Sequence, residues 1–345
     1  MTLLFPISND DLAATVGRSV SSGKRVDILP YEPIRESIPD NINEYCFFLK
    51  PELATLTGAA LDSAIGIVID GLSRVDQTLV GVSVLPGRYL ERHDIMAKHY
   101  SVINRASVNG FFALSEEGQA RAAQMLGVDE ASSLDVLGGE QFIKQFDYFT
   151  PHALCALHDS LPSVKLDAGA YGVRVVVDGR SMVLINGFHP LQLDWFYRPI
   201  GAIVVMVFRG EFSWKTMRQE VVGATNPSAA SASTIRGRLL LAATELGFPV
   251  SALRNGVHAS AGPLEGAVEI ARYMSPLDTS QRMPIDSTTF GAQLARVLGS
   301  AEAERLASNP PIAVSGESAA SFDATEEMDA ADVLRLLAAV EVSHQ

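Results

Sequence analysis

Two continuous apolar runs, far apart in the chain, constrain the fold most strongly. The first covers residues 44–49 and stops at Lys50 and Pro51, and the second covers residues 201–208. Short apolar runs that end at strand-breaking residues are typical of strands buried on both faces, and proline cannot donate to a central ladder. The two runs therefore predict central strands, with Lys50 presented at the end of the first.

Segments with helical or strand periodicity surround these runs. We expect helices over 53–75, 88–100 and 211–227, strands over 79–86 and 250–253, and an amphipathic helix that begins at Pro263. Once residues 105–195 are set aside, the core reads strand, helix, strand, strand, helix, strand. This order matches a ferredoxin-like α+β sandwich, a four-stranded antiparallel sheet with helices.

Two further regions lie before and within this core. Residues 1–40 are expected to form an N-terminal extension, with a short helix near 11–14 and a proline-rich connection. Residues 105–195 are far too long for a plain loop and are expected to form an inserted α+β subdomain. Within it we predict a helix over 115–127 and a hairpin over 172–187 that turns at Asp178-Gly179.

Residues 278–345 are expected to form a helical C-terminal extension. We predict helices over 288–300 and 328–342, and we interpret the Pro, Ser and Gly-rich piece at 309–321 as a linker. The last helix has an apolar stripe, so it should dock either on this protein or on a second copy.

The bulk composition narrows the class of partner. The 345 residues carry a formal net charge of −13, and no basic patch stands out, which argues against nucleic acid or an anionic membrane as a general partner. Cys46 and Cys155 are too few for a disulfide framework, which fits a reducing compartment. With no run long enough to span a membrane, we expect a soluble cytoplasmic protein.

The C-terminal half of the predicted core concentrates side chains suited to phosphoryl transfer. His258 offers a ring nitrogen that is nucleophilic near neutral pH, and Glu269 in the following helix offers a carboxylate to orient the ring. Arg236 and Asn255 offer the charge and donors that phosphoryl oxygens need. In the plainer alternative His258 is a structural or solvated histidine, and Glu269 pairs with Arg272 on a solvated helix face.

Four motifs in order carry a resemblance to a known family. Lys50-Pro51-Glu52 follows the first apolar strand, and GATNP at 223–227, TIRG at 234–237 and RNGVHAS at 254–260 follow the second. This series resembles the nucleoside diphosphate kinase family over roughly 41–104 and 196–277, which is less than half of the chain. The resemblance implies an enzyme that moves the γ-phosphoryl of ATP or another nucleoside triphosphate through a phosphohistidine to a nucleoside diphosphate.

The resemblance also assigns roles to individual residues. It implies catalysis by His258, Glu269 and Lys50, and nucleotide or phosphate binding by Lys50, Tyr100, Arg218, Thr225, Arg236, Asn255 and Ser260. It implies Mg²⁺ bound through the nucleotide, and the lack of a carboxylate cluster predicts no metal site on the protein itself. It further implies nucleotides as partners and a homo-oligomer. For Tyr100 the alternative is an ordinary helix cap.

Departures from the family pattern keep the acceptor open. The family's phosphate-binding Arg position is Gln219 here, with Arg218 one residue earlier, and Ala261 replaces an Asp. We expect Gly262 and Pro263 to take the cap and first positions of the next helix. Because 105–195 replaces the family's nucleotide clamp, two alternatives stay open: a pathway-specific kinase with another acceptor, and a catalytically weak nucleotide-binding regulatory protein.

Overall fold

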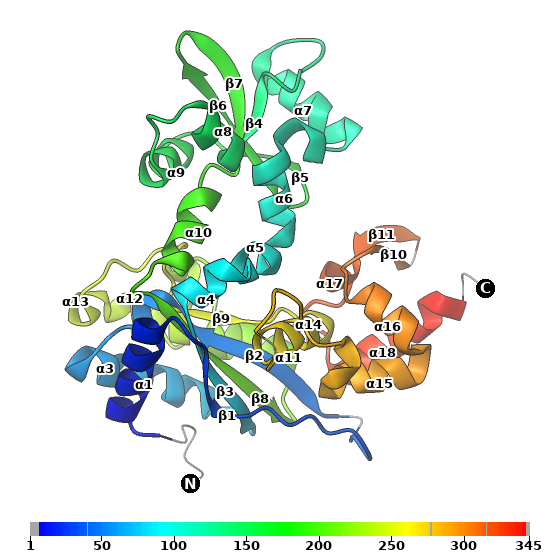
Figure 1. The fold of residues 1–345 in the computed structure, drawn as a ribbon. Coiled ribbons are helices and arrows are strands. Elements are labelled where there is room, and N and C mark those ends of the chain that lie inside the picture. The colour runs from blue at the N-terminus through cyan, green and yellow to red at the C-terminus, as the bar shows by residue number, and fades with distance from the viewer. Residues whose placement is uncertain (1–6, 40, 277, 315, 343–345) are drawn as a thin grey trace. The chain divides into compact units, whose positions relative to one another are not determined.

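The computed structural model describes residues 7–39, 41–276, 278–314 and 316–342. The chain divides into two compact units (Figure 1). The first unit comprises residues 1–93 and 198–345, and the second comprises residues 94–197. Among the described residues, no helix is both long and apolar enough to cross a membrane.

A five-stranded antiparallel sheet forms the centre of the first unit. The strands lie in the order β1-β3-β8-β2-β9. Their bounds are β1 Val26–Leu29, β2 Asn43–Leu49, β3 Thr78–Pro86, β8 Ala202–Gly210 and β9 Val257–Ala259. All seven residues of β2 are buried, and β2 pairs with both β8 and β9. The two apolar runs therefore form central strands, as predicted.

The strand order identifies the core of this unit. Along the chain, the four core strands come in the order β2, β3, β8, β9. Across the sheet they lie in the order β9, β2, β8, β3, so the fourth strand lies next to the first, followed by the third and the second. Helical segments connect β2 to β3 and β8 to β9, while β1 adds an edge strand beside β3. This arrangement is a ferredoxin-like α+β core.

Helices cover both faces of this sheet. Their bounds are α1 Asn9–Ser22, α2 Pro51–Ala54, α3 Gly58–Leu72, α4 Gly87–Arg92, α11 Trp214–Thr216, the π-helical segment η2 Met217–Val222, α12 Ile235–Leu241, α13 Ala243–Leu246 and α14 Pro263–Tyr273. Alternate side chains of a strand point to opposite faces. Tyr45, Phe47 and Leu49 pack in one cluster with α1 and α3, whereas Phe48 on the other face contacts Tyr273 of α14.

Three expected elements of the core differ from the structure. The strand expected over 250–253 is a loop, and pairing with β2 starts only at Val257. The helix expected over 211–227 ends at Val222, after a π-helical turn. The helix expected over 88–100 is interrupted at Asp94, whose φ of 50° is left-handed and cannot continue a helix.

The second unit has its own four-stranded sheet in the order β4-β7-β6-β5. The strands are β4 Val136–Gly138, β5 Val164–Asp167, β6 Ala170–Val177 and β7 Arg180–Ile185, and the helices are α5 Ile95–His99, α6 Ser101–Asn109, α7 Glu116–Leu126, α8 Gly139–Gln145, α9 Pro151–Asp159 and α10 His189–Tyr197. As predicted, β6 and β7 form a hairpin. Asp178 and Gly179 both have positive φ, as a tight primed turn requires.

The C-terminal extension packs against the first unit's own core. It contains α15 Thr289–Leu298, α16 Ser300–Leu306, β10 Pro311–Val314, β11 Glu317–Ala320, α17 Ser321–Ala324 and α18 Ala330–Val342. Val333 and Leu337 of α18 are buried in one cluster with Leu264 and Val268 of α14, so α18 docks on this chain. The linker interpretation of 309–321 is wrong. Residues 311–314 and 317–320 of this piece pair as the antiparallel strands β10 and β11, and buried Ile312 anchors them in the same cluster.

Candidate active site

The strand pair β2–β9 fixes the position of His258. His258 lies directly opposite Phe48 in the antiparallel register, and the two rings stack with centroids 4.5 Å apart. Paired residues of neighbouring strands share one face of the sheet, so His258 faces the side that α14 covers. Its side chain remains 16% exposed, which leaves the ring accessible to a small substrate.

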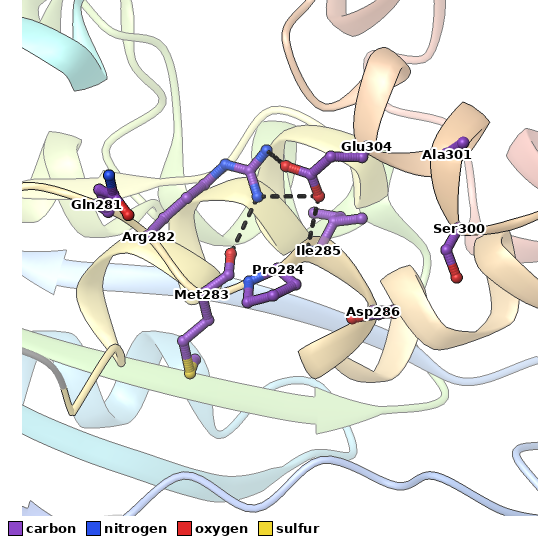
Figure 2. Close-up of a pocket in the computed structure, with 9 residues that line it drawn as sticks. All are labelled: Gln281, Arg282, Met283, Pro284, Ile285, Asp286, Ser300, Ala301 and Glu304. Carbon is purple, nitrogen blue, oxygen red and sulfur yellow. Dashed lines mark hydrogen bonds and ion pairs between the residues drawn. The ribbon is translucent and has the colours of Figure 1, made fainter.

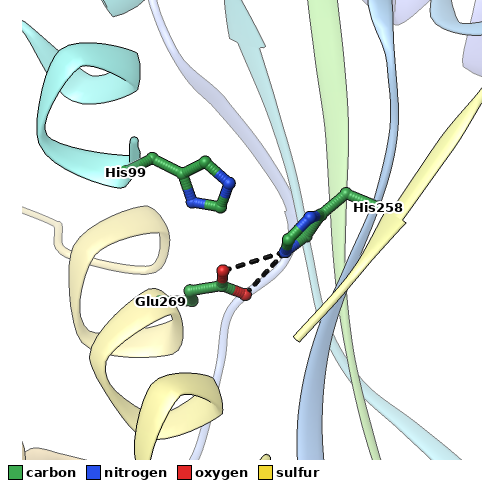
Figure 3. Close-up of side chains that lie close together, drawn as sticks. All are labelled: His99, His258 and Glu269. Atoms are coloured by element: carbon green, nitrogen blue, oxygen red, sulfur yellow. Dashed lines mark hydrogen bonds and ion pairs between the residues drawn. The ribbon is translucent and has the colours of Figure 1, made fainter. Parts of the chain in front are cut away.

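Glu269 of α14 holds the His258 ring (Figure 3). The His258 Nε2 lies 2.8 Å from Oε1 and 3.0 Å from Oε2 of this carboxylate. α14 begins as expected, with Gly262 as its N-cap and Pro263 in its first turn. Glu269 is 1% exposed, so the alternative that places it on a solvated helix face is wrong.

Ser260 fixes the carboxylate from the opposite side. Its Oγ lies 2.7 Å from Glu269 Oε2 and accepts the Cys46 N–H at 3.1 Å. A hydroxyl has one hydrogen, which the Glu269 carboxylate attracts most strongly. The chain of contacts therefore runs from β2 through Ser260 and Glu269 to His258. With Nε2–H donated to Glu269, the lone pair of the imidazole lies on Nδ1.

Two buried cations lie beside β9: Arg236 on α12, and Lys50 at the end of β2. Arg236 of α12 donates to the Gly223 carbonyl at 2.8 Å and the Val257 carbonyl at 3.1 Å, which ties the GATNP turn to β9. Lys50, which is 7% exposed, lies with Nζ 3.4 Å from the Leu253 carbonyl. Burial, reinforced by the charge of Arg236, lowers the pKa of Lys50 to about 8.

These cations also set the charge state of the imidazole. Burial lowers the pKa of His258 well below its ordinary value, and the charges of Lys50, Arg236 and Arg218 lower it further. A neutral imidazole keeps one nitrogen lone pair for nucleophilic attack, whereas a protonated ring has none. The surroundings of His258 therefore favour the nucleophilic form at neutral pH.

Asn255 connects two of the loops around the site. Its Nδ2 donates to the Thr225 carbonyl at 2.9 Å and to the Ala252 carbonyl at 3.2 Å. Its Oδ1 is buried and has no hydrogen-bond partner among the residues that the structure describes. The side chain of Thr225 itself is exposed in the turn. Carbonyls of the 250–253 segment thus bond to Asn255 and Lys50 instead of to a strand.

Arg218 lies in the π-helical segment η2 and contacts two acids. Its guanidinium is 2.7 Å from Glu326 and 3.7 Å from Glu327, while Gln219 donates to Glu327 at 2.6 Å. A π-helical turn takes up one more residue than an α-helical turn. The one-residue offset between Arg218 and the family's Arg position thus coincides with a local change in helix geometry.

Tyr100 is the one predicted site residue outside the first unit. It belongs to the second unit, between α5 and α6, where its ring lies 4.5 Å from that of His99 and 6.1 Å from that of Phe196. This unit begins at Asp94, earlier than the expected insertion over 105–195. The first unit by itself brings together the other predicted residues around His258.

The sequence analysis gave no role to two acids beside the site, Glu52 and Glu265. Glu52 accepts the Gly256 N–H at 2.9 Å and so fixes the turn before β9. Gly256 itself has a φ of 83°, and a side chain at this position would collide with Leu239. Glu265 accepts the Ala261 N–H at 2.7 Å, and burial together with Glu269 raises its pKa to about 7. The acidic residue three positions into a helix is a signal that could have found Glu265.

A cavity of about 780 Å³ in the C-terminal extension contains none of these residues (Figure 2). It is lined by the segment 281–286 together with residues of α16. Its one arginine, Arg282, forms an ion pair with Glu304 and donates to the Met283 carbonyl at 3.0 Å. The one cation of the cavity is therefore already paired with an acid, Asp286 adds a second negative charge, and the reactive side chains lie elsewhere.

Comparison with known proteins agrees with the motifs. No family model matches the chain. A nucleoside diphosphate kinase of Methylobacterium sp. (strain 4-46) is 38% identical over 78 residues, covering 23% of this chain and 49% of the relative. Those of Beijerinckia indica and Dinoroseobacter shibae are 40% identical over 75 residues and 41% over 76 residues, covering 22% of this chain and 46% and 47% of the relatives.

The extent of these matches is limited. The chain spans about half the length of the curated relatives that it matches. A solved NDP kinase from Pyrobaculum aerophilum has a TM-score of 0.32 and 19% identity, over 66% of this chain and 93% of that one. The ordered motifs and the curated matches together show that part of the chain is similar to nucleoside diphosphate kinases, and that the chain carries further regions outside the matched 75–78 residues.

Proposed function

We propose that this protein is a phosphotransferase that moves the γ-phosphoryl of a nucleoside triphosphate to His258 and then to a nucleoside diphosphate. One observation carries the proposal. The buried Glu269 carboxylate lies 2.8 Å from Nε2 of the His258 ring, and two buried cations, Lys50 and Arg236, lie in the same site. A histidine with a purely structural role does not need a buried carboxylate and two buried cations around it.

In the first half-reaction the lone pair of His258 Nδ1 attacks the γ-phosphorus. The N–P bond forms as the bond to the β,γ-bridging oxygen breaks, and the nucleoside diphosphate leaves with that electron pair. The ring gains positive charge as it attacks, and the Glu269 carboxylate on Nε2 stabilises that charge. No proton has to leave Nδ1 first, because the neutral ring already holds its hydrogen on Nε2. Transfer to the acceptor reverses these steps.

Fixed donors then bind the transferring phosphoryl oxygens. We assign this role to Lys50, as a compact charge, and to Arg236 and Asn255, whose positions are fixed by the loops they join. Thr225, Arg218 and Tyr100 are proposed as further nucleotide contacts. Ser260 acts indirectly, because its hydroxyl holds the carboxylate of Glu269 in place.

The resemblance implies Mg²⁺, and the residues of this site fit a metal ion that binds together with the nucleotide. Glu269 is bonded by His258 and Ser260, and Glu265 by the Ala261 amide, so both carboxylates already have donors. This favours Mg²⁺ held by the nucleotide's phosphates, where it would neutralise their charge.

The acceptor is tested by a labelling and chase experiment. The protein is incubated with γ-labelled ATP, desalted, and chased separately with GDP, CDP and buffer. We expect acid-labile label that GDP or CDP removes within the dead time and buffer does not. Label that resists every nucleoside diphosphate points to another acceptor. The structural argument for such an acceptor is that the second unit stands in the sequence where the family has its nucleotide clamp. Nucleotide binding without label contradicts the transferase proposal and favours a regulatory protein.

A further inference from the structure

The C-terminal segment 325–329 lies against the turn that follows His258. The Glu327 N–H donates to the Ala261 carbonyl at 2.9 Å. At Gly262 an added Cβ would lie 2.6 Å from the Thr325 carbonyl oxygen, so the two backbones are in direct contact. The extension therefore borders the proposed phosphotransfer site.

The backbone of this segment is held firmly enough to aim its side chains. Asp329 at its end accepts the Trp214 N–H at 2.8 Å and an Asn43 Nδ2–H at 3.2 Å. Glu327 has a φ of 57°, a left-handed conformation that is rare for glutamate and persists only where the surroundings impose it. The two neighbouring carboxylates, Glu326 and Glu327, are consequently presented to η2.

Both carboxylates face Arg218. The Glu326 carboxylate is 2.7 Å from the guanidinium and the Glu327 carboxylate 3.7 Å, and Gln219 adds a bond to Glu327 at 2.6 Å. Arg218 borders the reaction centre, because its partner Glu327 is bonded through its own N–H to the Ala261 carbonyl, three residues after His258. In keeping with this position, the charge of Arg218 lowers the pKa of both His258 and Glu265. Two negative charges thus oppose one of the three positive charges that act on His258.

We propose that Glu326 and Glu327 are specificity-determining residues, which compete with phosphate oxygens for Arg218 and so penalise ligands with long, highly charged phosphate chains. The inference rests on the proposed function for the identity of the ligand. A bound phosphate chain must either displace these carboxylates or lie beside them, and the repulsion grows with the charge of the chain. Removing the two charges should therefore favour ATP over ADP.

The test measures binding to the full chain by calorimetry, with ATP, ADP and inorganic tripolyphosphate as probes. The Glu326→Gln/Glu327→Gln variant should bind ATP and tripolyphosphate about three- to ten-fold more tightly than wild type, as expected for release of a partly exposed ion pair. The gain for ADP should be smaller, and both gains should shrink in 0.5 M salt, roughly as screening predicts. If the double variant fails to fold, the single variant Glu326→Gln replaces it in the binding measurement, because the Glu326 side chain is 44% exposed and its substitution should be tolerated.

Matched variants separate this effect from general charge and stability. Glu317→Gln/Asp323→Asn removes the same charge from exposed positions of the same extension and should leave binding unchanged. In an Arg218→Gln background, the acid substitutions should no longer raise the affinity for ATP.

Equal affinities of wild type and acid variants, or a gain that persists without Arg218, overturn the inference. Absence of tripolyphosphate and ATP binding in every variant also overturns it. The transferase proposal is judged separately, by acid-labile label on the wild-type protein. A labelled protein whose acid variants bind like wild type would refute the inference alone.

Discussion

At the scale of single residues, the candidate site depends on how one buried carboxylate is held. Glu269 is fixed between Ser260 Oγ at 2.7 Å and His258 Nε2 at 2.8 Å, and Ser260 is itself bonded to the backbone of β2. The sheet thus sets the position of the imidazole through two side chains. Replacing either one loosens the ring without removing the nucleophile.

Glu269→Gln should slow the formation of acid-labile label by roughly 100-fold, because an amide keeps the shape of the side chain but loses the charge that stabilises the ring. Ser260→Ala should cost about 10-fold or less, since it removes one hydrogen bond and leaves the carboxylate. Rapid-quench labelling with γ-labelled ATP measures both rates. A Glu269→Gln protein that labels at the wild-type rate contradicts the orienting role.

The depressed pKa of Lys50 predicts a pH dependence of nucleotide binding. An ordinary lysine keeps its proton to about pH 10. Burial lowers the pKa of Lys50 to about 8, so its positive charge is lost as the pH rises through that value. The affinity for ATP should therefore fall between about pH 7 and 9 in wild type.

Two variants assign this pH effect. Lys50→Arg keeps its charge throughout the range and should flatten the upper part of the profile. Glu265, whose pKa is raised to about 7, gains negative charge lower in the same range, and Glu265→Gln removes that contribution. An identical slope in wild type and Lys50→Arg would show that Lys50 is not the titrating group.

At the scale of elements, α18 is part of the first unit's core. Leu337 is 2% exposed and packs in the cluster that includes Leu264 of α14, the helix that carries Glu269. Leu337→Ala should lower the free energy of unfolding of this unit by about 2–5 kcal/mol, through lost burial and the cavity left behind.

A leucine on the surface provides the control for this prediction. Leu241 is 74% exposed, so Leu241→Ala should change the free energy of unfolding by less than about 0.5 kcal/mol. Urea unfolding measured by circular dichroism compares the two variants. Equal stability of Leu337→Ala and wild type would show that α18 is not docked as described.

Elements with strong local patterns were predictable from the sequence. β2 and β8 are continuous apolar runs, and the hairpin of β6 and β7 has Asp178-Gly179 at its turn. The 250–253 segment also looks like a strand locally. It fails because pairing with β2 begins at Val257, and side chains of Asn255 and Lys50 bond to its carbonyls instead. The register with β2 and the bond from Lys50 are both long-range, so the local sequence carries no signal for them.

At the scale of the whole molecule, the same distinction holds for the site. The contact of His258 with Glu269 was predictable, because the motif places both residues and the helix from Pro263 turns the carboxylate back. The contact of Arg218 with Glu326 joins positions 108 residues apart, and composition gave no reason to pair them. The pairing of β10 with β11 could likewise not be predicted from the sequence. Its anchor, Ile312, is buried by residues that lie far away in the chain and come together only in the folded protein.

The central claim is that His258 accepts the phosphoryl group, and locating the label tests it most directly. Wild type, His258→Ala and His152→Ala are incubated with γ-labelled ATP, digested at alkaline pH, and the phosphopeptides are identified by mass spectrometry. His152 is an exposed histidine of the second unit and serves as the control. We predict acid-labile phosphate on His258 in wild type and His152→Ala, and none in His258→Ala. Label that persists in His258→Ala, or that maps to another residue, contradicts the account.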